Sequence, residues 1–250
     1  MDNKKRIVIL GATSAIAEHC ARLWIEQEPI DLILVGRDSE RVRRVASDLL
    51  VRSPESEVRA IHAVFLDPEA IEASVANIFQ SGRVDVVLIA YGSLPGQAGC
   101  QGDLVACKDA IDINGVSPVL YAEAFAQQME KENHGMIILI GSVAGDRGRK
   151  SNYVYGAAKG LVARYAQGLQ HRFARTGVQV VLVKPGPTDT PMTAHLKSEG
   201  VKLASADIVA KQIVEGSRAG KPVIYAPSKW WLIMMVVRHI PAAVFNRFNI

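Results

Sequence analysis

The sequence predicts an α/β fold: a single doubly wound, Rossmann-like parallel sheet with helices on both faces, followed by a short apolar and amphipathic helical tail. Short apolar runs alternate along the chain with longer segments of helical periodicity. Strands that are apolar throughout are typical of parallel sheets covered on both faces. With 250 residues, 49% of them hydrophobic and 22% charged, the chain is long enough to bury a sizeable core.

The first half of the chain is predicted to contain three strand–helix units and a fourth strand. Its apolar runs predict the strands, and the longer segments between them predict the helices. In chain order these are strand Arg6–Leu10, helix Ala15–Gln27, strand Asp31–Val35, the arginine-rich amphipathic helix Ser39–Val51, strand Val58–Val64, helix Pro68–Gln80 and strand Val84–Ala90.

The second half continues the alternation, with longer helices. In chain order we expect helices Leu104–Asn114 and Ser117–Glu132, strand Gly135–Ile140, helix Asn152–Arg175, strand Val178–Val183, helix Ser205–Ala219 and strand Pro222–Tyr225. No linker rich in Pro or Gly occurs before about residue 226. We therefore interpret residues 1–226 as one domain and residues 227–250 as a C-terminal helical extension.

Composition and charge argue against several classes of protein. The net charge is +4, but the basic residues are scattered without interleaved aromatics, so we expect no nucleic-acid binding. Cys20, Cys100 and Cys107 lack metal-ligand spacing, so we expect free thiols in a reducing compartment and no metal site. The first six residues run directly into a strand without a long apolar segment, so we expect no signal peptide and a cytoplasmic location.

Three residues suited to proton transfer lie in the longest predicted helix and shortly before it. Tyr155 and Lys159 stand four residues apart, so they share one face of that helix. A lysine ammonium beside a phenol is expected to lower the phenol pKa from about 10, and such a phenol can exchange a proton with a carbonyl or an alcohol. Ser142, just after the strand Gly135–Ile140, is expected to hold the same oxygen. Such a pair also occurs on solvated helices, but the rest of the chain favours the catalytic interpretation.

A candidate cofactor site follows the first strand. The turn Gly11-Ala-Thr-Ser-Ala-Ile-Ala17 lacks bulk, which lets backbone N–H groups and a helix N-terminus approach a pyrophosphate, although such a turn can also serve packing alone. After the second strand, Arg37 can pair with a 2′-phosphate, which favours NADP(H) over NAD(H), and Asp38 can equally cap the next helix. Asp67 is placed to receive an adenine amino group or to cap the helix at Pro68.

Together these residues resemble the short-chain dehydrogenase/reductase family across residues 5 to about 225. The matching segments are Gly11–Ala17, Asp67, Asn114, Ser142, Tyr155-x-x-x-Lys159 and Pro185-Gly-Pro-Thr-Asp-Thr190. The resemblance implies that Ser142, Tyr155 and Lys159 are catalytic and that Asn114 supports a proton-relay water. It implies cofactor contacts from Gly11, Thr13, Ser14, Ala15, Ile16, Arg37, Asp67, Ala90, Tyr91, Gly92, Tyr155, Lys159, Pro185, Gly186, Thr188 and Thr190.

Two segments depart from the family pattern. Ile89-Ala90-Tyr91-Gly92 stands where the family usually has Asn-Asn-Ala-Gly, and Ala15 and Ala17 replace two glycines of the first turn. Both departures concern cofactor fit, so they bear on affinity more than on activity.

The C-terminal half resembles one subfamily, the decaprenylphosphoryl 2-keto-ribose reductases. The matching segments are Gly145–Tyr155, Thr190–Lys197, Tyr225-Ala-Pro and Met234-Met-Val-Val-Arg-His-Ile-Pro241. This resemblance implies reduction of a keto sugar carried on a polyprenyl phosphate, the second half of a ribose-to-arabinose epimerisation. It also implies a flavin-dependent oxidase as a partner that makes the keto sugar.

The segment between Ser142 and Tyr155 is basic. Arg147, Arg149 and Lys150 are three cations in four residues, which suits an anionic group of a substrate such as a phosphodiester. A loop charged only for solubility is an equal alternative.

Beyond Tyr225 the composition shifts. Trp230–Val237 is an apolar run of eight residues beside Lys229 and Arg238, too short for the roughly 20 residues that span a bilayer. Val244, Phe245 and Phe248 then share one helical face, away from Asn246, Arg247 and Asn249. We expect this tail, including Trp230 and Trp231, to lie at a membrane interface, or else to bind the lipid or pack on the core or a second subunit.

Two other functions stay open from the sequence. One is the same reduction on a different lipophilic ketone, such as a 3-oxoacyl chain or a steroid-like compound, which would not need Arg149 and Lys150. The other is a non-catalytic NADP-binding scaffold, which would have no reason to keep all three of Ser142, Tyr155 and Lys159. We also expect a homo-oligomer, in peripheral contact with the inner face of the cell membrane.

Overall fold

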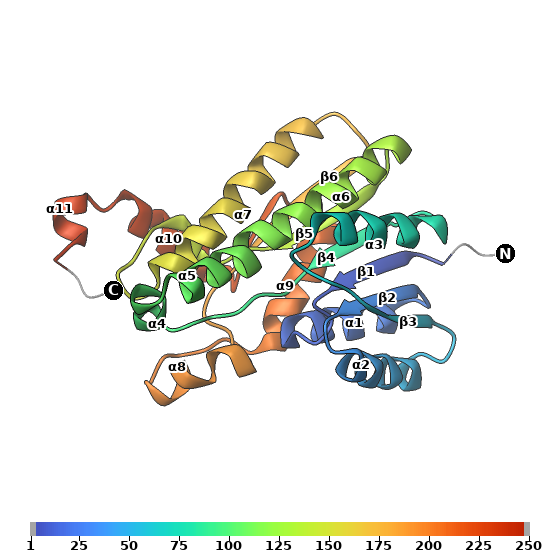
Figure 1. Cartoon of the computed structure of the whole chain (residues 1–250), viewed down its shortest axis with the longest axis horizontal. Coiled ribbons are helices and arrows are strands. Elements are labelled where there is room, and N and C mark those ends of the chain that lie inside the picture. Colours follow the sequence, from blue (N-terminus) through green and yellow to red (C-terminus); the bar gives the residue numbers. More distant parts are fainter. Residues whose placement is uncertain (1–3, 248–250) are drawn as a thin grey trace.

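A computed structural model describes residues 4–247 as one parallel sheet between two layers of helices (Figure 1). The seven strands follow the order β3-β2-β1-β4-β5-β6-β7. Their bounds are β1 Arg6–Leu10, β2 Asp31–Gly36, β3 Glu57–His62, β4 Val86–Ile89, β5 Gly135–Ile140, β6 Val178–Pro185 and β7 Val223–Ala226. The chain adds β2 and β3 on one side of β1 and then β4 to β7 on the other side. Ligands of such sheets bind at the point where this direction changes, which here lies beside β1. The predicted doubly wound fold is confirmed.

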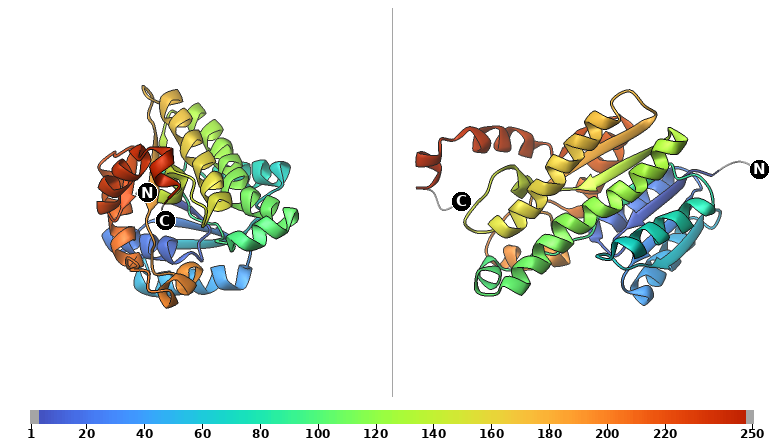
Figure 2. Two further views of the ribbon diagram at one scale, coloured as in Figure 1. Left: turned by 90° about the vertical axis from the view of Figure 1, so that its left-hand side faces the viewer. Right: turned by 45° about the horizontal axis from the view of Figure 1, so that its top comes forward.

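Alternating strand residues serve two separate hydrophobic cores. In β1, Val8 and Leu10 face one core, whereas Ile7 and Ile9 face the other. The first core is covered by α3 (Pro68–Gln80), α6 (Ser117–Glu132) and α7 (Tyr153–Arg172). The second is covered by α1 (Ala15–Gln27), α2 (Ser39–Arg52) and α9 (Ala206–Arg218), so the sheet is covered on both faces (Figure 2).

Most predicted elements are confirmed, and the differences have local causes. The edge strand β3 lies earlier than predicted, and its half-exposed pattern gives a weak hydrophobic signal. The predicted helix to Asn114 is α5 (Leu104–Ile111) followed by a π-helical turn, η1 (Asp112–Val116). The sequence patterns did not predict the short elements α4 Gln97–Gly102, η2 Val143–Asp146, η3 Pro191–Thr193 and α8 Ala194–Ser198.

The tail forms two further helices, α10 (Lys229–His239) and α11 (Ala242–Phe245), beyond the carboxyl end of the sheet (Figure 1). Trp230 is half-buried and Met234 is buried, so one side of α10 packs on the domain. The Trp230 indole packs on Gly186, whereas Trp231 is exposed, and the expectation that the tail lies at a membrane interface stays a prediction. The predicted roles of Phe248 and Asn249 lie outside the described residues. No helix within residues 4–247 is both long and apolar enough to cross a bilayer.

A buried ion pair joins the end of β6 to η2. Lys184 donates from Nζ to Asp146, and Tyr225 of β7 donates from its hydroxyl to Asp146 Oδ2 at 2.7 Å. The side chains of Lys184 and Asp146 are only 7% and 3% exposed. Burial and the Asp146 carboxylate raise the pKa of Tyr225 to about 12, so the phenol remains a hydrogen-bond donor. This group fixes η2, and with it the turn after Ser142, against β6 and β7.

Removing one partner of a buried ion pair leaves an uncompensated charge, which costs about 3–5 kcal/mol. Asp146→Ala is therefore expected to lower the free energy of unfolding, measured in urea, by that amount. Asp189→Ala is the matched control, because Asp189 pairs with Lys197 at an exposed site and such pairs contribute less than about 1 kcal/mol. Equal losses in the two variants would contradict this role for Asp146.

Candidate active site

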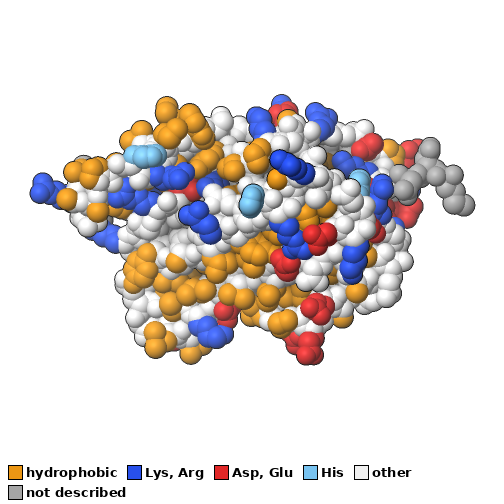
Figure 3. Space-filling model, turned by 90° about the horizontal axis from the view of Figure 1, so that it is seen from above, with side chains coloured by type: hydrophobic (Ala, Val, Ile, Leu, Met, Phe, Trp, Pro, Cys, Tyr) orange, Lys and Arg blue, Asp and Glu red, His pale blue; other side chains and the backbone are white. Residues whose placement is uncertain are grey.

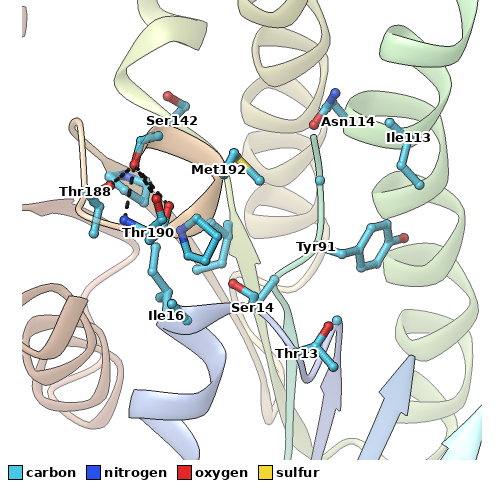
Figure 4. A pocket seen from close by; sticks show the side chains of 18 of the residues that line it. Thr13, Ser14, Ile16, Tyr91, Ile113, Asn114, Ser142, Thr188, Thr190 and Met192 are labelled. Atoms are coloured by element: carbon cyan, nitrogen blue, oxygen red, sulfur yellow. Dashed lines mark hydrogen bonds between the residues drawn. The ribbon is translucent and has the colours of Figure 1, made fainter. Parts of the chain in front are cut away.

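A cavity of about 370 Å³ opens at the carboxyl ends of the central strands. Its lining comes from the first turn, the ends of β2, β4, β5 and β6, η1, α7 and the loop after Pro185. In Figure 4, Thr13, Ser14 and Ile16 lie on one side of this cavity, and Ser142 and Asn114 lie on the other. Met192 lies between them. The fold thus joins the two candidate sites, for cofactor and for proton transfer, in one cavity.

Gly11 is the one residue of the first turn that has to be a glycine. Its φ of +82° lies in the left-handed region, and a Cβ there would stand 2.6 Å from Cβ of Tyr91. Ala15 and Ala17 occupy ordinary helical positions at the start of α1. The two alanines that depart from the family pattern therefore require no glycine conformation.

The close approach of α7 to η2 brings the proton-transfer residues together. A Cβ on Gly145 would meet the backbone carbon of Lys159 at 2.7 Å, and a Cβ on Gly156 would meet the carbonyl oxygen of Ala144 at 2.9 Å. Because no side chain separates the two elements here, Ser142 before η2 lies beside Tyr155 and Lys159 on the first turns of α7. All three side chains line the cavity, as the sequence predicted.

Burial dominates the electrostatics of this trio. Lys159 is 2% exposed, and its Nζ donates to the Ile140 carbonyl at 3.0 Å. Burial lowers the pKa of Lys159 to about 8. The pKa of Tyr155 is raised by burial, against a smaller lowering by a hydrogen bond with Ser142. The expectation that Lys159 lowers this phenol pKa is therefore not met in the free protein, where Nζ lies 5.9 Å from the ring centroid.

Asn114 lies in the π-helical turn and is completely buried. Its Nδ2 donates to Ala110 O at 2.8 Å, and its Oδ1 accepts from the Ser93 N–H at 2.9 Å. A Cβ on Gly92 would stand 2.6 Å from that Oδ1, so a glycine is required there. The Asn114 side chain thus fixes the strand end beside it, and a π-turn at this position is typical of functional sites.

Tyr91 stands where the family pattern has an alanine, and it forms a wall of the cavity. Its ring lies 4.5 Å, centroid to centroid, from Phe65. Its hydroxyl lies 2.8 Å from Ser117 Oγ, away from Ser142 (Figure 4). Burial raises the pKa of Tyr91 well above its usual value, so the group stays a neutral phenol.

The loop after β6 folds on itself at one side of the cavity. Thr188 Oγ1 donates to Gly186 O at 2.9 Å, and Thr193 Oγ1 donates to the Thr188 carbonyl and accepts from the Thr190 N–H (Figure 4). The Trp230 indole covers Gly186 from the opposite side, where a Cβ would stand 1.9 Å from its Nε1. The tail therefore supports this loop from behind.

Several predicted site residues lie elsewhere. Asp67 does not line the cavity but caps α3 by accepting from the Ala70 N–H at 3.0 Å. Arg147, Arg149 and Lys150 do not line it either. Arg147 donates from Nη1 to Val237 O and Ile240 O, each at 2.6 Å. Its predicted role in binding substrate phosphate is therefore corrected: Arg147 binds the tail.

The remaining cofactor residues of the sequence analysis line the cavity, Arg37 included. Asp38 beside it is a helix cap and accepts from the Arg41 N–H at 3.0 Å. Arg41 also lines the cavity and was missed, because Arg37 lies before the helix in which Arg41 stands and no helical spacing relates the two. Phe65, Ile113 and Met192 were missed without any local signal. Within residues 4–247, no group of three His, Cys, Asp or Glu side chains is arranged to hold a metal ion.

The family model described as short chain dehydrogenase matches residues 5–200. The chain belongs to the short-chain dehydrogenase family. An uncharacterised oxidoreductase of Streptomyces coelicolor is 29% identical over 243 residues, covering 97% of this chain and 95% of that protein. An uncharacterised oxidoreductase of Staphylococcus epidermidis is 30% identical, covering 84% and 90%. This member of the family is accordingly an oxidoreductase.

Solved structures share its fold at low sequence identity. A short-chain dehydrogenase from Sphingobium yanoikuyae in complex with NADPH superposes with a TM-score of 0.81 at 22% identity, covering 96% of this chain and 97% of that one. One from Burkholderia cenocepacia in complex with NADP gives 0.82 at 17% identity, covering 99% and 98%. At such identities the likeness shows the fold alone.

The buried Lys159 makes stability depend on pH. Because its pKa in the folded chain, about 8, lies below the ordinary 10.5, the unfolded chain binds more protons between these values, and stability rises with pH there. Unfolding in urea from pH 7.5 to 10.5 should show wild type gaining stability relative to Lys159→Met. A Lys211→Met control at an exposed site should follow wild type. A constant difference between wild type and Lys159→Met would contradict this burial effect.

Proposed function

We propose that this oxidoreductase reduces the keto group of a pentose linked to a polyprenyl phosphate, using NADPH. One observation carries the chemistry: Ser142, Tyr155 and Lys159 converge on one side of a cavity whose lining also includes Arg37 and Arg41. The substrate class rests on the resemblance of the C-terminal half to the keto-ribose reductases and on two features of the structure, the basic loop and the tail.

The cavity fits a dinucleotide. The left-handed Gly11 leaves no side chain at the turn where a pyrophosphate would approach, and the N-terminus of α1 follows it. Arg37 and Arg41 would hold a 2′-phosphate, so NADPH is favoured and NADH is the alternative. Two family members of the same fold are complexes with NADPH and NADP. When bound, the nicotinamide supplies the hydride.

Side chains of the protein then supply the proton and stabilise the charges that its transfer creates. Ser142 Oγ accepts from the Ala144 N–H at 3.1 Å, which fixes a hydroxyl that can donate its hydrogen to the ketone oxygen. Tyr155 gives its proton to that oxygen, and the raised pKa keeps the phenol protonated in the free enzyme. Lys159 holds the positive charge that stabilises the phenolate left behind. Asn114 fixes the adjacent strand end and lines the same cavity.

Arg149 supports a phosphate-bearing substrate. Its Nε is buried without a hydrogen-bond partner among residues 4–247, and burial lowers the pKa of its guanidinium. A buried donor left unpaired costs free energy, and a phosphodiester oxygen would satisfy it. Lys150, exposed beside it, adds a second charge. A neutral ketone, the alternative substrate, has no use for either.

Partners and location follow from such a substrate. A flavin-dependent oxidase would supply the ketone, and a lipid-linked sugar places the enzyme in peripheral contact with the inner face of the cell membrane. A homo-oligomer is part of the same proposal. The scaffold alternative makes a different prediction, tight NADPH binding without turnover of any ketone.

Cofactor preference tests the dinucleotide assignment. A hydrogen bond to a charged group contributes about 1.5–3 kcal/mol, so Arg37→Ala and Arg41→Ala should each weaken NADPH binding roughly ten- to a hundredfold and leave NADH nearly unchanged. Fluorescence titration measures both affinities. Arg44→Ala, an exposed arginine of α2 that does not line the cavity, is the control. Equal losses for both cofactors would show that Arg37 and Arg41 serve only the fold.

Turnover of a polyprenylphosphoryl 2-keto-pentose tests the substrate class. The double variant Arg149→Ala, Lys150→Ala should raise KM for this substrate and leave kcat for a small neutral ketone at saturation unchanged, because only the first carries a phosphate. The control is Arg43→Ala, Arg44→Ala, which removes the same charge from α2. No turnover of the phosphate substrate, or equal damage with both ketones, would contradict the proposal.

A further inference from the structure

The helix α10 carries a continuous apolar surface on its outer side. We call this surface the outer face of α10: Trp231, Leu232, Met235 and Val236. These side chains are 54%, 62%, 44% and 59% exposed. Residues four apart on a helix are neighbours, so the four form one stripe. Isolated exposed hydrophobic residues are ordinary, whereas a contiguous apolar stripe on a surface marks an interaction site.

The opposite side of α10 is tied firmly to the domain. Met234 is 2% exposed, and the Trp230 indole lies against Gly186 at the cavity. Arg147 donates to the Val237 and Ile240 carbonyls at the end of the helix, and its guanidinium lies 3.7 Å from the Phe245 ring centroid. The outer face is therefore displayed on a fixed helix.

The charged side chains of the last 35 residues have one sign. No Asp or Glu follows Glu215 in the sequence. The Lys and Arg residues after it are Arg218, Lys221, Lys229, Arg238 and Arg247. The last 35 residues thus carry five positive charges and no acidic side chain, against a net charge of +4 for the whole chain. Basic and hydrophobic side chains lie together at the end of the molecule formed by α10 and α11 (Figure 3).

We propose that the outer face of α10 docks on an anionic lipid surface, with the helix lying in the plane of that surface. Eleven residues make a helix of only about 16 Å, against roughly 30 Å of hydrocarbon, so α10 lies on the bilayer. Trp231 suits the headgroup boundary, and Lys229 and Arg238 at the helix ends meet anionic headgroups.

A second copy of the chain fits this face less well. A two-fold contact would place the same surface of two copies together, which opposes Lys229 and Arg238 of one copy to those of the other without an acidic residue of the tail to pair them. Lipid phosphates compensate these charges, whereas self-association adds to their repulsion. The inference depends on the tail and not on the identity of the ketone.

Docking would orient the active site. The tail lies beyond the carboxyl end of the sheet (Figures 1 and 2). The cavity is lined by residues at this same end of the strands. Trp230 connects α10 directly to Gly186, a lining residue. A lipid surface under the outer face therefore lies beside the end of the molecule that admits substrate.

The test is sedimentation of the full chain with two kinds of vesicle, one of phosphatidylcholine alone and one of phosphatidylcholine and phosphatidylglycerol in equal parts. The wild type should bind the anionic vesicles at least tenfold more tightly, and added salt should weaken this binding. The variant Trp231→Ser, Leu232→Ser, Met235→Ser, Val236→Ser should lose it and retain NADPH binding and turnover of a soluble ketone. The matched control is Leu50→Ser, Val51→Ser, exposed hydrophobic residues of α2.

A second variant keeps the test decisive if the first variant misfolds. Lys229→Glu, Arg247→Glu keeps the outer face and reverses two of the five positive charges of the last 35 residues, and it should also weaken binding to anionic vesicles. Absence of binding by the wild type, or equal binding by all variants, would overturn the proposal. So would light scattering that shows a wild-type dimer, indifferent to vesicles, converted to monomer by the serine variant, because the face would then be a subunit contact.

Discussion

The contact between the backbones of α7 and η2 is the constraint on which the site depends. Gly145 and Gly156 have no room for a side chain, because a Cβ on either would stand less than 3 Å from backbone atoms of the other element. The hydrophobic cores hold α7 against the sheet and β5 within it. The glycine contact holds the start of α7 against the turn that follows β5. It brings Ser142, Tyr155 and Lys159 into one cavity, although Ser142 comes from a different element.

The same contact creates the unusual electrostatics of the site. Tight packing excludes water from Lys159, so its pKa falls to about 8, while the pKa of the neighbouring phenol rises. Burial thus shifts both groups toward their neutral forms and separates their pKa values, since that of the ammonium falls to about 8 while that of the phenol rises. Another buried lysine, Lys184, differs in having a carboxylate partner, Asp146. The raised pKa keeps the phenol protonated in the free protein, as an acid catalyst requires.

Local patterns predicted the sheet, most helices and the Tyr155–Lys159 pair, because strand and helix periodicities and i,i+4 spacing are properties of short segments. Such patterns do not predict interactions between segments that are distant in the sequence. Arg147 was assigned to substrate, whereas its acceptors, Val237 and Ile240, lie ninety or more positions away. Trp230 likewise packs on a residue distant in the sequence, Gly186, and no local pattern shows this contact. The pKa of Tyr155 was predicted with the wrong sign, since a sequence shows the neighbouring lysine but not the burial.

Tyr155 is the proton donor of the proposed reaction, and the most direct test of this role is kcat of Tyr155→Phe beside that of Tyr153→Phe. Tyr153, two positions earlier, is 43% exposed and accepts a hydrogen bond from Gln101 at 3.1 Å, so its variant removes a comparable hydroxyl outside the cavity. General acid–base catalysis contributes a factor of about 10²–10⁴. We expect such a loss of kcat in Tyr155→Phe, with NADPH binding retained and Tyr153→Phe close to wild type. A Tyr155→Phe enzyme that keeps more than about a tenth of wild-type kcat would contradict this role.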